Sequence, residues 1–170
     1  MKRIALLALA ACLPLVPANA NDHEFTGILA GVKEVPAVST VARGEFRAYV
    51  SGNTVHYLLR YANLEGAVTQ AHIHLGQPAV AGGVIVWLCS NMPSPPTPPG
   101  VPPCPAPPAR VTGIITAGDV VGPTAQGIDP GEFAELVRAL RNGVTYANVH
   151  TDRFPTGELR SKIHPPGDRD

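Results

Sequence analysis

Residues 70–76 read Gln-Ala-His-Ile-His-Leu-Gly and bring two strong metal ligands within two positions of each other. In a β-strand, alternate side chains share a face at a rise of about 3.3 Å per residue, so His72 and His74 would lie roughly 6.6 Å apart at Cα. Two imidazoles at that separation can converge on one ion with bonds of about 2 Å. On a helix the pair would diverge by about 200°, so only a strand predicts chelation.

His150 is the third candidate ligand, because Tyr146, Asn148 and His150 alternate along another predicted strand. Tyr146 and Asn148 are polar groups that could orient a ligand through its second ring nitrogen. Imidazole suits copper and zinc, and three such ligands leave a coordination position open. We predict one copper ion, with zinc as the competitor, bound by His72, His74 and His150. Binding should weaken as pH falls through about 6.5, where free histidine is protonated. The competing interpretation is three solvated histidines on exposed strand faces.

The remaining histidines are weaker candidates. His56 shares its predicted strand face with Leu58 and Arg60, which are not ligands for such an ion. His23 and His164 lie near the chain ends, where we expect both to be solvated.

Motifs for catalysis are missing from the sequence. There is no nucleophile elbow with Ser, His and Asp in order, no phosphate-binding glycine loop and no zinc-protease motif. Glu158 and Arg160 share a predicted strand face, where we expect surface ion pairing with neighbouring strands. We therefore expect no enzymatic activity.

Segments with period-two alternation predict most of the secondary structure. For example, the run from Thr54 to Tyr61 follows the run from Gly44 to Val50 across Ser51-Gly52-Asn53, as in a hairpin. The pattern predicts an all-β fold, an antiparallel, Greek-key-like β-sandwich of about eight strands. The expected strands cover residues 23–31, 44–50, 54–61, 70–76, 84–88, 110–116, 145–150 and 157–163.

One amphipathic helix is predicted from Pro130 to about Asn142. Asp129 is a good N-cap, Glu132 can complete a capping box, and Gly143 suits the left-handed position after the helix. The inner face of this helix consists of four apolar residues: Phe133, Leu136, Val137 and Leu140. Their spacing predicts that the helix packs over one edge of a sheet.

In a proline-rich tract, residues 93–108, ten of sixteen residues are proline; Cys89 precedes this tract and Cys104 lies near its end. Proline fixes φ and removes backbone donors, so we expect a stiff surface loop inserted between strands. Recognition by an aromatic-grooved protein module is the alternative. In an exported chain we expect the two cysteines to form a disulfide, which would contribute about 3 kcal/mol by closing a loop of about 15 residues.

The first twenty residues are typical of a secretory signal peptide. Lys2-Arg3 precede an apolar run, residues 4–11, and Ala18-Asn19-Ala20 fits a cleavage site. We predict a signal peptide at residues 1–20, cleaved near Ala20, and one exported domain at 21–170 in the periplasm or outside the cell. Lipid attachment at Cys12, which follows Leu-Ala-Ala, is the less favoured alternative.

The charge balance after the signal peptide argues against a nucleic-acid partner. Without Lys2 and Arg3, 11 Lys and Arg face 13 Asp and Glu, a formal charge of −2. No later stretch approaches the roughly 20 apolar residues of a transmembrane helix, so we expect no membrane span.

Several segments together resemble the CHRD domain, which is named after the extracellular regulator chordin and also occurs in exported bacterial proteins. They are Ala-His-Ile-His-Leu-Gly at 71–76, Leu88-Cys89, Tyr-Ala-Asn-Val-His-Thr at 146–151, and Phe-Pro-Thr-Gly-Glu-Leu-Arg at 154–160. The resemblance extends over about residues 24–164. It implies fold and export more than activity, because a fold hosts many functions.

A looser similarity links the chain to copper/zinc superoxide dismutases, which are β-sandwiches with a His-x-His strand and a later histidine at copper. His72, His74 and His150 would match these ligands, but no zinc-loop cluster of His and Asp lies between the pair and His150. Three functions therefore stay open: a non-enzymatic exported metal-binding protein, a metal-free extracytoplasmic module that binds a protein partner, and, much less favoured, a dismutase.

Overall fold

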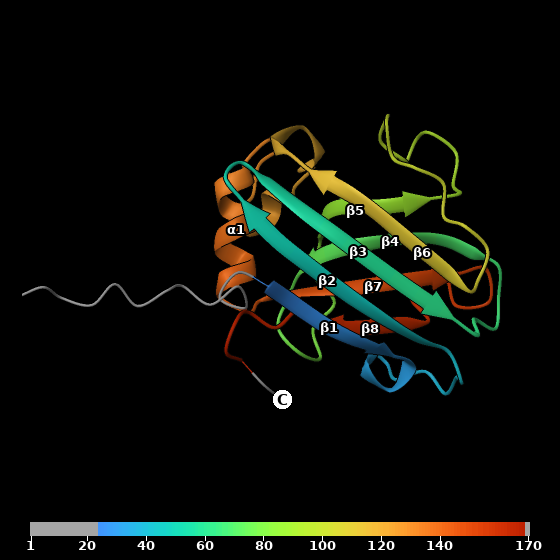
Figure 1. Ribbon diagram of the computed structural model, residues 1–170. Coiled ribbons are helices and arrows are strands. Elements are labelled where there is room, and N and C mark those ends of the chain that lie inside the picture. Colours follow the sequence, from blue (N-terminus) through green and yellow to red (C-terminus); the bar gives the residue numbers. More distant parts are fainter. Residues whose placement is uncertain (1–23, 169–170) are drawn as a thin grey trace, which may run out of the picture.

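Eight antiparallel strands and one α-helix dominate the computed structural model, which describes residues 24–168 (Figure 1). The strands are β1 Glu24–Ala30, β2 Arg43–Ser51, β3 Thr54–Ala62, β4 Val68–Leu75, β5 Val84–Ser90, β6 Ala109–Ile115, β7 Thr145–Thr151 and β8 Leu159–Lys162. The predicted all-β antiparallel fold is confirmed. The expected signal peptide, its cleavage near Ala20, the alternative at Cys12, and His23 all lie outside the described residues.

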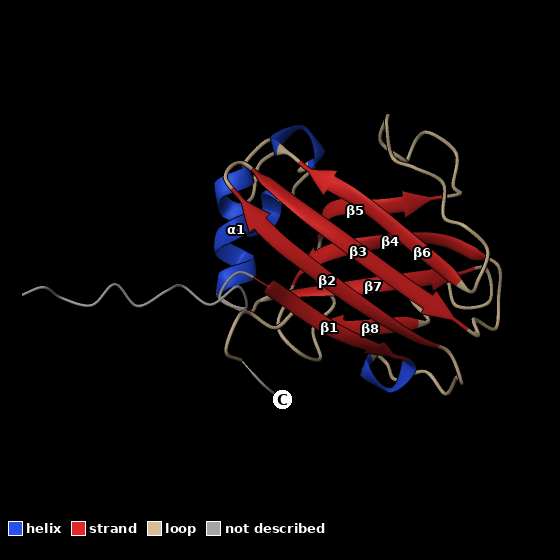
Figure 2. Cartoon of the chain, viewed as in Figure 1, coloured by secondary structure: helices blue, strands red, loops and turns tan. Residues whose placement is uncertain are grey.

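The strands join into one curved sheet with the order β5-β4-β7-β8-β1-β2-β3-β6. Figure 2 shows β2, β3 and β6 crossing one side while β4, β5, β7 and β8 form the other. The sheet thus curls toward a barrel, and the predicted sandwich describes its two facing layers only approximately. The pairings β4 with β7, β1 with β8 and β3 with β6 join strands distant in sequence, as in Greek-key folds.

The core lies between the two layers because one face of each strand is apolar. On β4, Ala71 and Ile73 are completely buried, and Ala147 and Val149 of β7 are buried beside them. β7 is unusual because all seven of its residues are buried. Its outer face must therefore be covered by other parts of the chain, and this covered face holds the candidate ligands.

The helix is shorter than predicted, since α1 covers Phe133–Arg141. The Glu132 side chain accepts from the Asp129 backbone N–H at 2.8 Å, so Asp129 to Glu132 form a hydrogen-bonded turn before the helix. The predicted N-cap at Asp129 is therefore wrong. Gly143 does adopt a left-handed conformation with φ of 62°, as expected, and Leu136, Val137 and Leu140 are buried.

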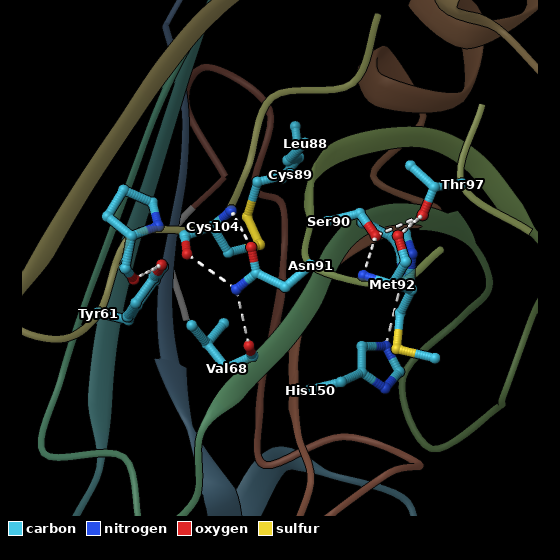
Figure 3. Close-up of a disulfide and its surroundings, with 12 residues drawn as sticks. Tyr61, Val68, Leu88, Cys89, Ser90, Asn91, Met92, Thr97, Cys104 and His150 are labelled. Atoms are coloured by element: carbon cyan, nitrogen blue, oxygen red, sulfur yellow. Dashed lines mark hydrogen bonds between the residues drawn. A yellow bond between two sulfur atoms is a disulfide. The ribbon is translucent and has the colours of Figure 1, made fainter. Parts of the chain in front are cut away.

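A disulfide joins Cys89 and Cys104, whose Cα atoms are 4.9 Å apart. Figure 3 shows Asn91 beside this bond. Its side-chain amide donates to Val68 O and Cys104 O, both at 2.9 Å, and its carbonyl oxygen accepts from Cys104 N at 3.0 Å. Ser90 Oγ, at the end of β5, and Thr97 Oγ1 of the loop hydrogen-bond at 2.6 Å. The proline-rich segment is thus tied at both ends, as expected for a stiff loop.

Among residues 24–168, no helix has the length and apolar character needed to cross a membrane.

Candidate metal centre

Three histidines meet on the outer face of β4 and β7. In the antiparallel register, His72 lies opposite Asn148 and His74 opposite Tyr146, while His150 is one pair further along. His72, His74 and His150 are only 3%, 8% and 7% exposed. The prediction that they share a face is confirmed, whereas the alternative of solvated histidines is wrong.

Hydrogen bonds fix which ring nitrogens carry protons. Nδ1 of His74 can only donate to Gly82 O, at 3.0 Å, and Nδ1 of His150 can only donate to Pro155 O, at 2.9 Å. The Nε2 of His150 therefore holds a lone pair, which accepts from Nδ1 of His72 at 3.2 Å. His72 and His74 consequently each keep an unprotonated Nε2. Both atoms are buried without a hydrogen-bond partner in the described chain.

The cluster has dimensions that suit one ion. One ring nitrogen from each histidine lies within 4.8 Å of the other two, and this is the one such group of three or more His, Cys, Asp or Glu in residues 24–168. Ligands on one ion at about 2.1 Å lie within about 4.2 Å of one another. Small ring rotations would therefore close the cluster onto an ion.

The environment keeps the rings neutral. Burial lowers the pKa of His72 to about 2, with the neighbouring His150 and His74 adding to the effect. Burial also lowers the pKa of His74 to about 4, although the hydrogen bond to Gly82 opposes this shift. The pKa of His150 is lowered by burial as well. The pH at which protons should compete with a metal therefore lies well below the expected 6.5.

Tyr146 fixes the position of His74. The two rings are stacked, with centroids 4.6 Å apart and planes 3° from parallel. The Tyr146 hydroxyl accepts from Gly82 N at 3.0 Å, and Gly82 O is the acceptor for His74. On the other side of the ring, the Arg160 guanidinium lies 3.5 Å from the Tyr146 centroid. Arg160, Tyr146 and His74 thus form a three-layer stack.

Trp87 covers the opposite side of the cluster. Its ring meets His72 edge-on, with centroids 4.3 Å apart, because β5 pairs His72 with Trp87. Trp87 is the single tryptophan of the chain. Its fluorescence therefore reports directly on events at His72.

Several sequence-based expectations need correction. His56, the weaker ligand candidate, is exposed and is not part of the cluster. His164 was expected to be solvated, but it is only 8% exposed and its backbone pairs with Thr26. Glu158 and Arg160 are 0% and 4% exposed. The expected surface ion pairing with neighbouring strands is wrong, because both side chains are buried and belong to different polar groups.

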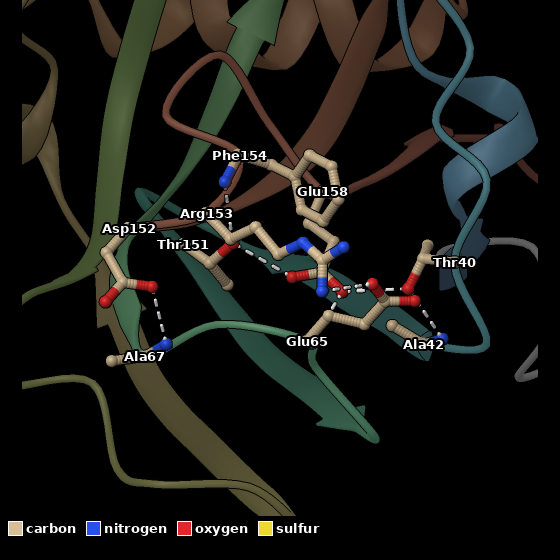
Figure 4. Close-up of polar contacts among 9 residues, drawn as sticks. All are labelled: Thr40, Ala42, Glu65, Ala67, Thr151, Asp152, Arg153, Phe154 and Glu158. Carbon is tan, nitrogen blue, oxygen red and sulfur yellow. Dashed lines mark hydrogen bonds and ion pairs between the residues drawn. The ribbon is translucent and has the colours of Figure 1, made fainter.

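Glu158 organises a network of its own (Figure 4). Its Oε1 accepts from Thr40 Oγ1 and from the backbone N–H of Glu65, and its Oε2 accepts from Thr151 Oγ1, all at 2.9 Å. The carboxylate thereby joins three segments of the chain. Its role is to hold the loops around the end of β7.

The residues that orient the histidines were partly missed. Tyr146 and Asn148 were expected to hold a second ring nitrogen, yet the acceptors are the carbonyls of Gly82 and Pro155. Asn148 Nδ2 instead donates to Glu34 Oε1 at 2.6 Å. Every residue has a backbone carbonyl, so residue types could not predict which carbonyls would accept hydrogen bonds from the histidines.

Fold and site together define a class of antiparallel β-proteins with a buried three-histidine cluster on a sheet face. A family model for the CHRD domain matches residues 25–163, and the chain belongs to this family. No curated protein and no solved structure was found to match it.

Proposed function

We propose that this CHRD-family chain is an exported, non-enzymatic protein that binds one transition-metal ion through His72, His74 and His150. The observation that carries the proposal is the pair of buried, unprotonated Nε2 atoms on His72 and His74. A buried polar atom without a partner costs about 1–3 kcal/mol. A metal ion that binds these lone pairs would offset this cost.

Copper is the ion we favour, with zinc as the competitor. The cluster consists of three imidazoles and contains no carboxylate or thiolate. Burying an ion in such neutral surroundings costs less for a single than for a double positive charge. The nearby Arg160 charge, which also lowers the pKa of His74, acts in the same direction. These features support copper in its +1 state.

Export is part of the proposal. The Cys89–Cys104 disulfide is of a kind that persists in oxidising compartments, and the basic and apolar start of the sequence fits a signal peptide. A protein placed in the periplasm or outside the cell could take up copper there.

A metal-free module that binds an extracytoplasmic protein is the second candidate. Three apolar side chains on and after β1 favour it, because Ile28, Val32 and Val41 are 62%, 75% and 70% exposed. Scattered exposed apolar residues are common, however, and carry less weight than the histidine cluster.

Calorimetric titration tests metal binding. Copper(I), kept reduced under anaerobic conditions, and zinc(II) would each be added to wild type and to His72→Ala, His74→Ala and His150→Ala. We expect one ion per chain, tighter binding of copper, and at least about a 100-fold loss of affinity in each variant. His56→Ala, which removes an exposed histidine, is the matched control and should bind as wild type does.

Two results would decide against the proposal. If His74→Ala binds copper as well as wild type, the histidine cluster is not the site. If copper-loaded wild type turns over superoxide near the diffusional ceiling and His72→Ala does not, the protein is an enzyme. Trp87 fluorescence gives an independent readout, since copper beside His72 should quench it.

A further inference from the structure

A cavity of about 430 Å³ lies beside the histidine cluster, on the outer face of β7 and β8. Tyr146 separates the two, because it lines the cavity and also stacks on His74. The cavity has an apolar side that includes Val32, Pro78 and Ala79. Its polar side includes Glu34, Arg160 and Lys162.

Arg160 is the unusual residue of this cavity. It is only 4% exposed, yet none of the ion pairs within residues 24–168 includes it. Its Nη2 donates to Val80 O at 2.7 Å and to Gln77 O at 3.3 Å. Its Nε and Nη1 make no hydrogen bond to a described residue. The face of Tyr146 and the nearby Glu34 only partly compensate this buried cation, so donors directed at an anion would explain its position.

The surrounding charges also favour an anion. Lys162 adds a second cation, although its Nζ contacts Asp168 at 2.7 Å. Glu34 is the acidic residue of the wall, and burial raises its pKa to about 7 while the charge of Arg160 opposes the shift. Glu34 therefore carries less negative charge at neutral pH than an ordinary carboxyl group. The wall as a whole is positive.

We propose that this cavity binds a small organic carboxylate, whose carboxyl group meets Arg160 and Lys162 while its apolar chain contacts Val32, Pro78 and Ala79. The planar fork of arginine matches a carboxylate with paired N–H donors. The volume falls within the range of about 300–1,000 Å³ that is usual for small-molecule sites. The inference goes beyond metal binding and does not depend on it.

The test uses hexanoate as the probe and metal-free protein, so that binding to a metal cannot contribute. Hexanol and hexylamine have the same chain without the negative charge. We expect hexanoate to bind at least tenfold more tightly than either, and to shift the amide NMR signals of Gly76, Gln77 and Ala79. Equal or tighter binding of hexylamine would overturn the proposal.

Variants locate the site. Arg160→Gln should weaken hexanoate binding at least tenfold, whereas Glu34→Gln should bind as tightly as wild type or more tightly. Val32→Trp, at a position that is 75% exposed, should block the cavity and keeps the test valid if Arg160→Gln fails to fold.

The matched control is Arg153→Gln, which removes an equal charge from a guanidinium that lies over Phe154, outside the cavity lining. Binding equal to wild type in both Val32→Trp and Arg160→Gln, or an equal loss in Arg153→Gln, would contradict the proposal. Neither result bears on the proposed metal binding, because the experiment uses metal-free protein.

Discussion

The histidine cluster and the Glu158 network are both buried polar groups around β7, but they differ in how their atoms are satisfied. Both carboxylate oxygens of Glu158 accept hydrogen bonds from within the chain. In the cluster, Nε2 of His72 and of His74 accept none. The first group completes the fold by itself, whereas the second presents buried lone pairs on rings whose ligand atoms lie within 4.8 Å of one another. The comparison teaches that burial alone does not mark a candidate metal site. What distinguishes the cluster is that unsatisfied buried nitrogens of two histidines lie close to a third histidine.

Removing the Glu158 carboxylate should have the largest effect on folding. Glu158→Ala leaves Thr40, Thr151 and the backbone N–H of Glu65 without their acceptor, so we expect stability to fall by about 3 kcal/mol or more. Urea denaturation of the metal-free protein measures this change.

Glu24→Ala is the control for that experiment, because it removes an exposed carboxylate that pairs with Arg47 at 3.3 Å. Its effect should stay below about 1 kcal/mol. If Glu158→Ala is no more destabilising than Glu24→Ala, the network does not hold the fold.

The histidine cluster should show the opposite behaviour. His74→Ala loses the stack on Tyr146 and the bond to Gly82 O, but it also removes the partnerless Nε2, which offsets part of the cost. The stability of the metal-free protein should therefore fall by only about 1–2 kcal/mol, less than in Glu158→Ala. Copper at 100 times its dissociation constant should stabilise wild type by about 2.7 kcal/mol and the variant hardly at all. Denaturation curves with and without copper measure both values. A large loss of metal-free stability in the variant would make the cluster structural, like Glu158.

The pH dependence of binding separates buried from solvated ligands. Because burial lowers the pKa of His72 to about 2 and that of His74 to about 4, both are already neutral between pH 7 and 5.5. Protons should therefore compete at these two ligands only as pH falls toward 4. Because burial also lowers the pKa of His150, copper affinity should fall little from pH 7 to 5.5. Solvated histidines with a pKa of about 6.5 would instead lose affinity over this interval. Titrations at both pH values, with a copper(I) chelator as competitor, distinguish the two.

The smallest effect is expected at Tyr146. Tyr146→Phe keeps the ring stacked on His74 but removes the hydroxyl that contacts Gly82. We expect copper affinity to fall by about tenfold, at the lower end for residues that orient a ligand. Tyr49→Phe, at an exposed position, is the control and should not change the affinity. If the affinity of Tyr146→Phe is unchanged, the Tyr146 hydroxyl does not help to orient His74, and the hydrogen bond to the Gly82 carbonyl is sufficient.

The sequence predicted the strands and the shared face of His72 and His74 because alternation is a local property. It could not reveal that this face is buried, since Gly82 and Pro155 reach the histidines from loops. Glu158 and Arg160 were misjudged for the same reason, as alternation places side chains on a face without saying what covers it. The helix begins later than predicted because Asp129 and Glu132 satisfy each other in a preceding turn.

The most direct measurement is the histidine side-chain NMR spectrum, recorded while copper(I), which is diamagnetic, is added to ¹⁵N-labelled protein. We expect the ring signals of His72, His74 and His150 to be replaced together and completely at one equivalent. The Nδ1 protons of His74 and His150 should stay on the rings, hydrogen-bonded to the carbonyls of Gly82 and Pro155. The ring signals of His56 should not shift. If the three signals stay in place, or shift gradually along with His56, the cluster does not hold the ion.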